Sequence, residues 1–193
     1  VTGGKERIRF YVERFRPDFS KPKDFDDLVV ALHKAKTCHY VELLGRGGIP
    51  LRSGVKRLLS EARNAGIRLA IATTTTPENV TALLGNTLGG DPAEWFEVIA
   101  AGDIVPAKKP SPDIYFWALD KLKLDAADCL ALEDSENGVR ASVGAGLKTV
   151  VTVNDYTLDH DFSGVVAVLS DLGEPGQPFH LMSGEATDQE CVD

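Results

Sequence analysis

The sequence predicts an α/β fold, a Rossmann-like, mostly parallel sheet with a small helical domain in front of it. From Pro50 onward, helical patterns alternate with short apolar runs, which is typical of βαβ units and parallel strands. The preceding segment carries helical patterns only, and the clustered glycines Gly45, Gly47 and Gly48 make a flexible junction. We therefore predict three parts: a helical cap domain (1–48), an α/β core domain (49–172) and a flexible tail (173–193).

Composition narrows the class of protein. The 193 residues suffice for one or two compact domains, and the net charge of −8 argues against nucleic acid or an anionic membrane surface as a partner. Three widely spaced cysteines favour neither a disulfide framework nor a zinc site, and they fit a reducing compartment. We expect a monomer in the cytoplasm or in another reducing compartment such as the plastid stroma.

The first predicted helix begins near Gly4, because apolar residues from Ile8 to Phe15 repeat at helical spacing. Its amino terminus offers a hydroxyl, two unhindered backbone amides and a cation, which together form a plausible anion seat. These groups belong to Thr2, Gly3, Gly4 and Lys5. The alternative interpretation is a glycine hinge that leads into a surface helix.

A second helix is predicted from about Asp24 to Gly45, with acidic residues in its first turn. Its apolar stripe consists of Leu28, Ala31, Leu32, Ala35 and Cys38. Another face carries His33, Lys36 and Tyr40. Such a polar face is usually only solvated, but if the two helices cover a site, Lys36 is a candidate anion ligand.

The first core strand is predicted at residues 67–72, after a helix that stops at Gly66. Thr76 is a good helix cap and Pro77 a good first helical residue, so the next helix points its amino terminus at the strand end. Hydroxyls and free amides can converge on a phosphate there, and the candidates are Thr73, Thr74 and Thr75. An ordinary threonine-rich loop is the alternative.

The next strand is predicted at residues 96–100, followed by a proline-stiffened loop and a helix from about Pro112. Lys109 lies in this loop, where an extended backbone can direct its ammonium group across a crevice at the strand ends. Lysine suits phosphate oxygens, although a lone loop lysine is usually solvated. In the helix, we expect Tyr115 and Phe116 to supply core contacts.

The segment from Cys129 to Gly138 runs from an apolar strand into the carboxylate pair Glu133 and Asp134. Ligands of open α/β sheets bind at the carboxyl ends of strands, and paired carboxylates there suit Mg²⁺. The alternative is that Asp134 and Ser135 only cap the following helix. Small residues such as Gly138 allow close helix-to-sheet packing, and residues 165–169 are predicted as an edge strand.

Three short motifs follow one another along the chain. They are Thr73 after its strand, the KPSPD segment at 109–113, and Glu133-Asp134-Ser135 followed by Gly138. Together they resemble the second, third and fourth motifs of the haloacid dehalogenase-like superfamily, in its phosphatase and phosphomutase branch. TGGKERI near the start and HKAKT in the second helix look like the cap helices of CbbY-like phosphatases, which act on xylulose-1,5-bisphosphate. The resemblance extends from Thr2 to about Leu172.

The resemblance implies a role for each matching residue. Thr73 would hydrogen-bond the transferring phosphoryl group with help from the amides of Thr74 and Thr75, and Lys109 would neutralise its charge. Asp134, assisted by Glu133, would hold Mg²⁺. The distal phosphate of a bisphosphorylated sugar would be held by cap residues, namely Thr2, Gly3, Gly4, Lys5, Arg7 and Lys36.

The superfamily's first motif, D-x-D-G-T, does not occur in these 193 residues. That motif supplies the nucleophilic aspartate, and Asp103 and Asp113 lie in the wrong context to replace it. We therefore expect this chain alone to be inactive, with an unpaired gap in its sheet. The expected explanation is that a leading segment is clipped, disordered or present as a separate chain.

Three functions compete at this point. The first is a Mg²⁺-dependent phosphatase of small phosphorylated sugars, with sugar bisphosphates such as xylulose-1,5-bisphosphate as substrates. The second is a β-phosphoglucomutase-like phosphomutase, which shares the motifs. A non-catalytic binding or regulatory protein that has lost the nucleophile is the third. Dehalogenation needs no metal and would leave Glu133 and Asp134 unexplained.

Overall fold

The computed structural model describes residues 3–47, 49–185 and 190–192. Its helices are α1 (Gly4–Phe15), α2 (Phe25–Gly45), α3 (Val55–Asn64), α4 (Pro77–Thr87), α5 (Asp113–Leu122) and α6 (Glu136–Gly144), with short 3₁₀ turns at Pro92–Glu94 and Ala126–Asp128. The strands are β1 (Ala70–Thr73), β2 (Val98–Ala101), β3 (Leu130–Glu133), β4 (Lys148–Thr152), β5 (Ala167–Leu169) and β6 (Leu181–Gly184). In the described part of the chain, no helix is both long and apolar enough to cross a membrane.

The strands form two sheets rather than one. β1 pairs with β2 in parallel, and β3, β4 and β5 form a second parallel set. No strand pairing joins β1 to β3 within the described residues, so β1 and β3 are both edge strands. Leu132 of β3 is 45% exposed at this edge, although a central parallel strand normally buries such residues. The mostly parallel α/β architecture is therefore confirmed, and its sheet is interrupted between β1 and β3.

Helix α5 connects the two sheets through one hydrophobic cluster. Its buried residues Ile114 and Ala118 belong to the same cluster as Val98 of β2 and Ala131 of β3. Apolar burial is the main favourable term in folding, so this cluster holds the two sheets together. The carboxyl ends of β1 and β3 are consequently kept close to each other although no backbone hydrogen bonds link them.

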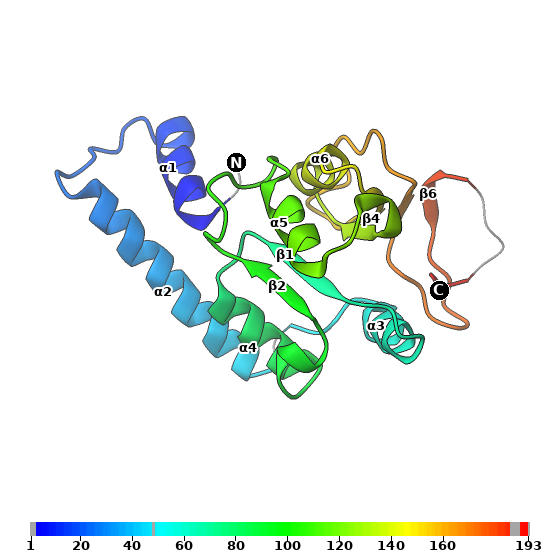
Figure 1. Cartoon of the computed structure of the whole chain (residues 1–193). Coiled ribbons are helices and arrows are strands. Elements are labelled where there is room, and N and C mark those ends of the chain that lie inside the picture. The colour runs from blue at the N-terminus through cyan, green and yellow to red at the C-terminus, as the bar shows by residue number, and fades with distance from the viewer. Residues whose placement is uncertain (1–2, 48, 186–189, 193) are drawn as a thin grey trace.

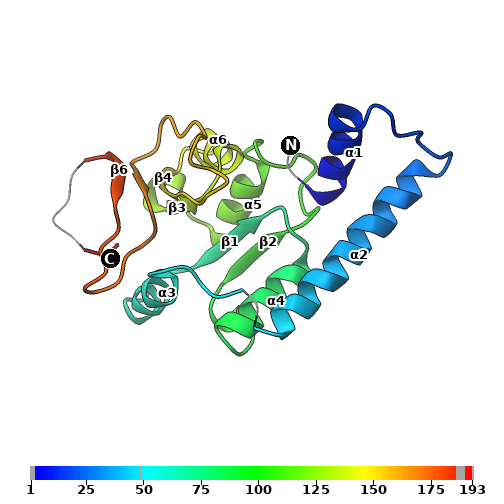
Figure 2. The ribbon, with the colours of Figure 1, turned by 180° about the vertical axis from the view of Figure 1, so that it is seen from behind.

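The cap helices α1 and α2 lie at one end of the molecule, and β6 lies at the other (Figures 1 and 2). Arg9 of α1 donates two hydrogen bonds to Asp26 of α2, at 3.1 and 2.9 Å. Helix α2 then runs alongside α4 of the core (Figure 1). The predicted apolar stripe of α2 is not its buried face: Leu32 is half exposed and Cys38 is exposed. The buried residues of α2 are Val29 and Leu44, which the predicted stripe did not contain.

The carboxyl-terminal part differs from the sequence expectation. The segment 165–169 was predicted as an edge strand, but β5 pairs on both sides, with β4 and with β6. Within the segment 173–193, which was predicted to be flexible apart from a short contact through Phe179 and Leu181, Leu181–Gly184 form β6 antiparallel to β5. The chain then returns to the core, where the Val192 amide donates to the Leu172 carbonyl oxygen at 3.0 Å.

Candidate active site

Lys109 joins the carboxyl ends of β1 and β3. Its ammonium nitrogen Nζ donates to the carbonyl oxygen of Ala72 in β1 at 3.0 Å and to Oε1 of Glu133 in β3 at 2.5 Å. The Lys109 and Glu133 side chains are only 10% and 7% exposed. Because Thr73 follows Ala72 and Asp134 follows Glu133, this one lysine brings all the predicted core site residues to the same edge of the two sheets.

Tyr115 of α5 is a site residue that the sequence analysis treated only as a core contact. Its hydroxyl donates to Glu133 Oε1 and accepts from Lys109 Nζ at 3.3 Å. Burial and the negative charge of Glu133 raise the pKa of Tyr115, so the phenol remains a hydrogen-bond donor. The sequence offered no signal for this contact, because it depends on the direction of the Tyr115 hydroxyl.

Gly138 of α6 is required by the Glu133 carboxylate. A Cβ atom at position 138 would lie 1.9 Å from Glu133 Oε2 and 2.3 Å from its Cδ. The sequence analysis assigned Gly138 to close packing of helix on sheet, but the group that approaches it is a charged side chain. This glycine therefore leaves space for the carboxylate that orients Lys109.

Asp134 does not cap α6, although capping was the alternative interpretation of this residue. Ser135 is the N-cap residue of α6, and its hydroxyl accepts from the Gly138 amide at 3.3 Å. Asp134 is exposed. Glu133, in contrast, is already engaged by Lys109 and Tyr115. Within the described residues, no group of three or more acidic, histidine or cysteine side chains could hold a metal ion on its own.

The threonine segment after β1 forms a structured turn. Thr73 Oγ1 accepts from the Thr75 amide at 3.2 Å, and Thr75 Oγ1 accepts from the amide nitrogen Nδ2 of Asn79 at 3.1 Å. Thr74 is half-buried beside them. The predicted cap Thr76 is at the N-cap position of α4, but its side chain makes no capping hydrogen bond. Its hydroxyl is buried without a partner in the described part of the chain.

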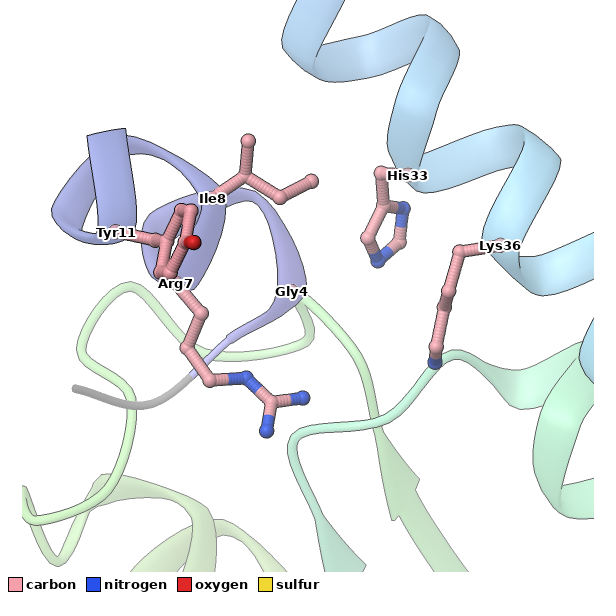
Figure 3. A pocket seen from close by; sticks show the side chains of 6 residues that line it. All are labelled: Gly4, Arg7, Ile8, Tyr11, His33 and Lys36. Carbon is pink, nitrogen blue, oxygen red and sulfur yellow. The ribbon is translucent and has the colours of Figure 1, made fainter. Parts of the chain in front are cut away.

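An open cavity of about 280 Å³ lies between the cap helices. It is lined by Gly4, Arg7, Ile8 and Tyr11 of α1 and by His33 and Lys36 of α2. Figure 3 shows that Arg7 and Lys36 extend their charged ends away from the two helices and toward the core loops. The sequence analysis had proposed Gly4, Arg7 and Lys36 as phosphate ligands. It placed His33 on the same face of α2 as Lys36 but gave it no role.

The glycines at the start of α1 are packed against other side chains. A Cβ atom on Gly4 would lie 2.4 Å from His33 Nε2, so the imidazole lies directly against the backbone there. Gly3 has a φ of 94°, a conformation that favours glycine. Lys5 does not line the cavity but lies 3.8 Å from Asp103 of the core. Thr2, the remaining predicted ligand, lies outside the described residues.

The fold and this arrangement of threonine, lysine and acidic pair define a class of protein. The chain belongs to the haloacid dehalogenase-like hydrolases, whose family model matches residues 4–146. The family predicted from the motifs is therefore confirmed.

Its relatives place it in the CbbY-like branch. The chain is 46% identical over 178 residues to the plasmid CbbY protein of Cupriavidus necator, which covers 92% of this chain and 70% of that protein. It resembles the crystal structure of CbbY from Rhodobacter sphaeroides in complex with phosphate, with a TM-score of 0.81 and 44% identity over 89% of this chain and 74% of the other. A mutant of the same CbbY in complex with xylulose-1,5-bisphosphate also matches at a TM-score of 0.81, with 45% identity over 88% and 73%.

Proposed function

We propose that this chain acts in a Mg²⁺-dependent phosphatase of small phosphorylated sugars, with sugar bisphosphates such as xylulose-1,5-bisphosphate as substrates. The observation that carries the proposal is the contact of Lys109 with both Ala72 and Glu133, which gathers a hydroxyl, a cation and a carboxylate at the strand ends. Phosphoryl transfer depends mainly on positioning and charge neutralisation, and these groups supply both.

In the core, Thr73 donates a hydrogen bond to the transferring phosphoryl group, and Thr74 contributes its backbone amide just before α4. The Thr75 amide, which donates to Thr73 Oγ1, orients that hydroxyl and lies within reach of the same phosphate. Lys109 neutralises negative charge on the phosphoryl oxygens. The nucleophilic aspartate comes from a D-x-D-G-T segment that these 193 residues do not contain. The open edges of β1 and β3 support this view, because a parallel strand between them would bring its carboxyl end to Lys109.

The acidic pair Glu133 and Asp134 fits Mg²⁺ without a third protein carboxylate. This ion is usually bound by one or two carboxylates together with substrate phosphate and water, so a protein cluster of three ligands is not required. Asp134 is exposed and would supply a direct oxygen ligand, and Glu133 would assist by holding Lys109 in place. Bound Mg²⁺ would supply further charge neutralisation at the phosphoryl oxygens.

In the cap, the second phosphate of the substrate lies against the cationic end of the cavity. Arg7 and Lys36 supply charge-assisted hydrogen bonds, and the turn at the start of α1 contributes backbone amides beside His33. The proposed ligands of this phosphate are Thr2, Gly3, Gly4, Lys5, Arg7 and Lys36. The two phosphates thus contact different parts of the molecule, one the core and the other the cap.

The first test uses the protein as its gene encodes it, assayed for phosphate release with and without Mg²⁺. Asp134→Asn should abolish Mg²⁺-dependent release, because an amide carries no charge for the cation. Lys36→Ala should raise the KM for xylulose-1,5-bisphosphate by about tenfold, which corresponds to one charge-assisted hydrogen bond, and leave p-nitrophenyl phosphate nearly unchanged.

The matched control is Lys34→Ala, an exposed lysine of α2 that does not line the cavity. It should change neither substrate's KM. Near-normal turnover by Asp134→Asn would refute the metal assignment, and an equal effect of Lys36→Ala on both substrates would remove the cap-recognition idea.

A further inference from the structure

Lys108, the neighbour of Lys109, contacts the cap rather than the core site. Its Nζ lies 3.1 Å from Glu6 Oε1 of α1 and 2.9 Å from Asp103 Oδ1, in the loop after β2. The Lys108 side chain is only 20% exposed. Glu6 and Lys108 are 102 residues apart in the chain, so this ion pair ties the cap to the core.

A second residue of the cap, Lys5, also forms an ion pair with the core. Lys5 Nζ lies 3.8 Å from Asp103 Oδ2, so opposite charges alternate along the group Lys5, Asp103, Lys108 and Glu6, here called the cap–core ion cluster. The hydrogen bond from Lys108 and its positive charge lower the pKa of Asp103, and Lys5 adds to this effect. Although burial opposes it, hydrogen bonding to Asp103 and Glu6 raises the pKa of Lys108. Both shifts favour the charged forms of Asp103 and Lys108.

The cap–core ion cluster lies directly against the turn that begins α1. A Cβ atom on Gly3 would lie 2.2 Å from Glu6 Oε2 and 3.2 Å from Lys108 Nζ. Gly4, the next residue, lines the cap cavity together with Arg7. The position of Lys108 thus fixes where the amides of this turn and the guanidinium of Arg7 lie relative to the core.

The two adjacent lysines of this loop contact different parts of the molecule. Lys109 reaches inward to Ala72 and Glu133, whereas Lys108 reaches outward to Glu6. Any movement that separates α1 from the core loop breaks the contacts of Lys108 with Glu6 and of Lys5 with Asp103, and it leaves the Lys109 contacts intact.

We propose that Lys108 is a positioning residue that holds the cap against the core, so that the cap's phosphate ligands and Lys109 engage the two ends of one substrate together. The inference rests on the proposed function and adds to it a residue outside both phosphate sites. Substrates that reach across from core to cap depend on the cluster, and small esters that occupy only the core do not.

The test compares Lys108→Met with Lys108→Arg in the protein as its gene encodes it. Hydrogen–deuterium exchange of residues 3–15 should rise in Lys108→Met, because α1 loses its tie to the core, and should return to the wild-type level in Lys108→Arg. The same Met variant should lower kcat/KM for xylulose-1,5-bisphosphate by about tenfold and change that for p-nitrophenyl phosphate less than about twofold.

Lys21→Met is the matched control, because it removes a 3.0 Å ion pair with Glu13 inside the cap and leaves the core untouched. It should alter neither the exchange of residues 3–7 nor the bisphosphate kinetics. Unchanged exchange in Lys108→Met, or equal losses with both substrates, would overturn the positioning role. A wild-type protein that hydrolyses neither ester would overturn the proposed function instead, and the exchange measurement would still decide whether Lys108 ties the cap to the core.

Discussion

At the scale of single residues, Lys109 and Glu133 form a buried pair of opposite charges with one aromatic neighbour. Taking two charges out of water is costly, so such a pair persists only when each charge keeps its partner. Tyr115 adds a hydrogen bond to the same carboxylate oxygen. The pair therefore connects the two sheets electrostatically and makes Glu133 sensitive to any change in Lys109.

Lys109→Met should lower the free energy of unfolding by about 3 to 5 kcal/mol, because it leaves the Glu133 charge buried and unpaired. The double variant Lys109→Met/Glu133→Leu should recover most of this loss, since no buried charge remains. Urea unfolding followed by circular dichroism measures both values. As a control, Lys121→Met removes an exposed ion pair with Asp120 and should cost less than about 1 kcal/mol. A single variant as stable as the control would contradict this account.

The positions of the proposed core site residues could be predicted because they lie at or near the ends of apolar strands. Thr73 and Glu133 end β1 and β3, Asp134 follows β3, and Lys109 lies in the loop after β2. Tyr115 could not be separated from core aromatics by spacing, since its role depends on the direction of one hydroxyl. Lys108 was likewise indistinguishable from a solvated lysine, because its partner Glu6 is remote in the chain.

At the scale of elements, helix α6 contains two glycines in different surroundings. Gly138 faces the Glu133 carboxylate, whereas a Cβ atom on Gly144 would make only ordinary contact, 3.6 Å from Pro112 Cβ. Replacing glycine by alanine improves helix propensity at both positions. Any difference in stability between the two variants therefore reports their packing.

Gly138→Ala should destabilise the protein by about 1 to 3 kcal/mol, because its methyl group displaces a carboxylate held by Lys109 and Tyr115. Gly144→Ala is the matched substitution, and it should be neutral or stabilising by up to about 1 kcal/mol. Thermal unfolding of both variants gives the comparison. If both alanines changed stability equally, the Glu133 contact would not be what requires glycine at position 138.

In α2 and β6, the sequence pattern alone did not predict which residues are buried or paired. The pattern of α2 predicted an apolar stripe facing a core, but Leu32 is 47% exposed because this part of the helix extends away from the core domain (Figure 1). Strand β6 was not predicted, because its residues lie among prolines and glycines, which disfavour strands. In the described residues it is held by pairing with β5, and local composition does not predict such a pairing.

At the scale of the whole molecule, stability depends on α5 because the two sheets share no strand pairing in the described residues. Ile114 is 1% exposed and belongs to the cluster that contains Val98 of β2 and Ala131 of β3. Phe116, two positions further along the helix, is 52% exposed, although the sequence analysis expected it in the core. The helix therefore offers one residue that joins the sheets and one that does not.

Ile114→Ala should lower the free energy of unfolding by about 2 to 5 kcal/mol, the usual cost of a cavity in a packed core. Hydrogen–deuterium exchange should increase in both β2 and β3, since the lost side chain served both sheets. Phe116→Ala is the control and should cost less than about 1 kcal/mol. An increase confined to one sheet in Ile114→Ala would show that α5 does not unite them.

The opposed directions of Lys108 and Lys109 also restrict how this protein can vary. If the chain before Val105 keeps its place, one residue inserted between Val105 and Lys108 would put Lys108 where Lys109 now lies and leave Glu6 without its lysine. One residue deleted there would put Lys109 where Lys108 now lies and leave Glu133 without its lysine. This loop can therefore change its amino acids more readily than its length.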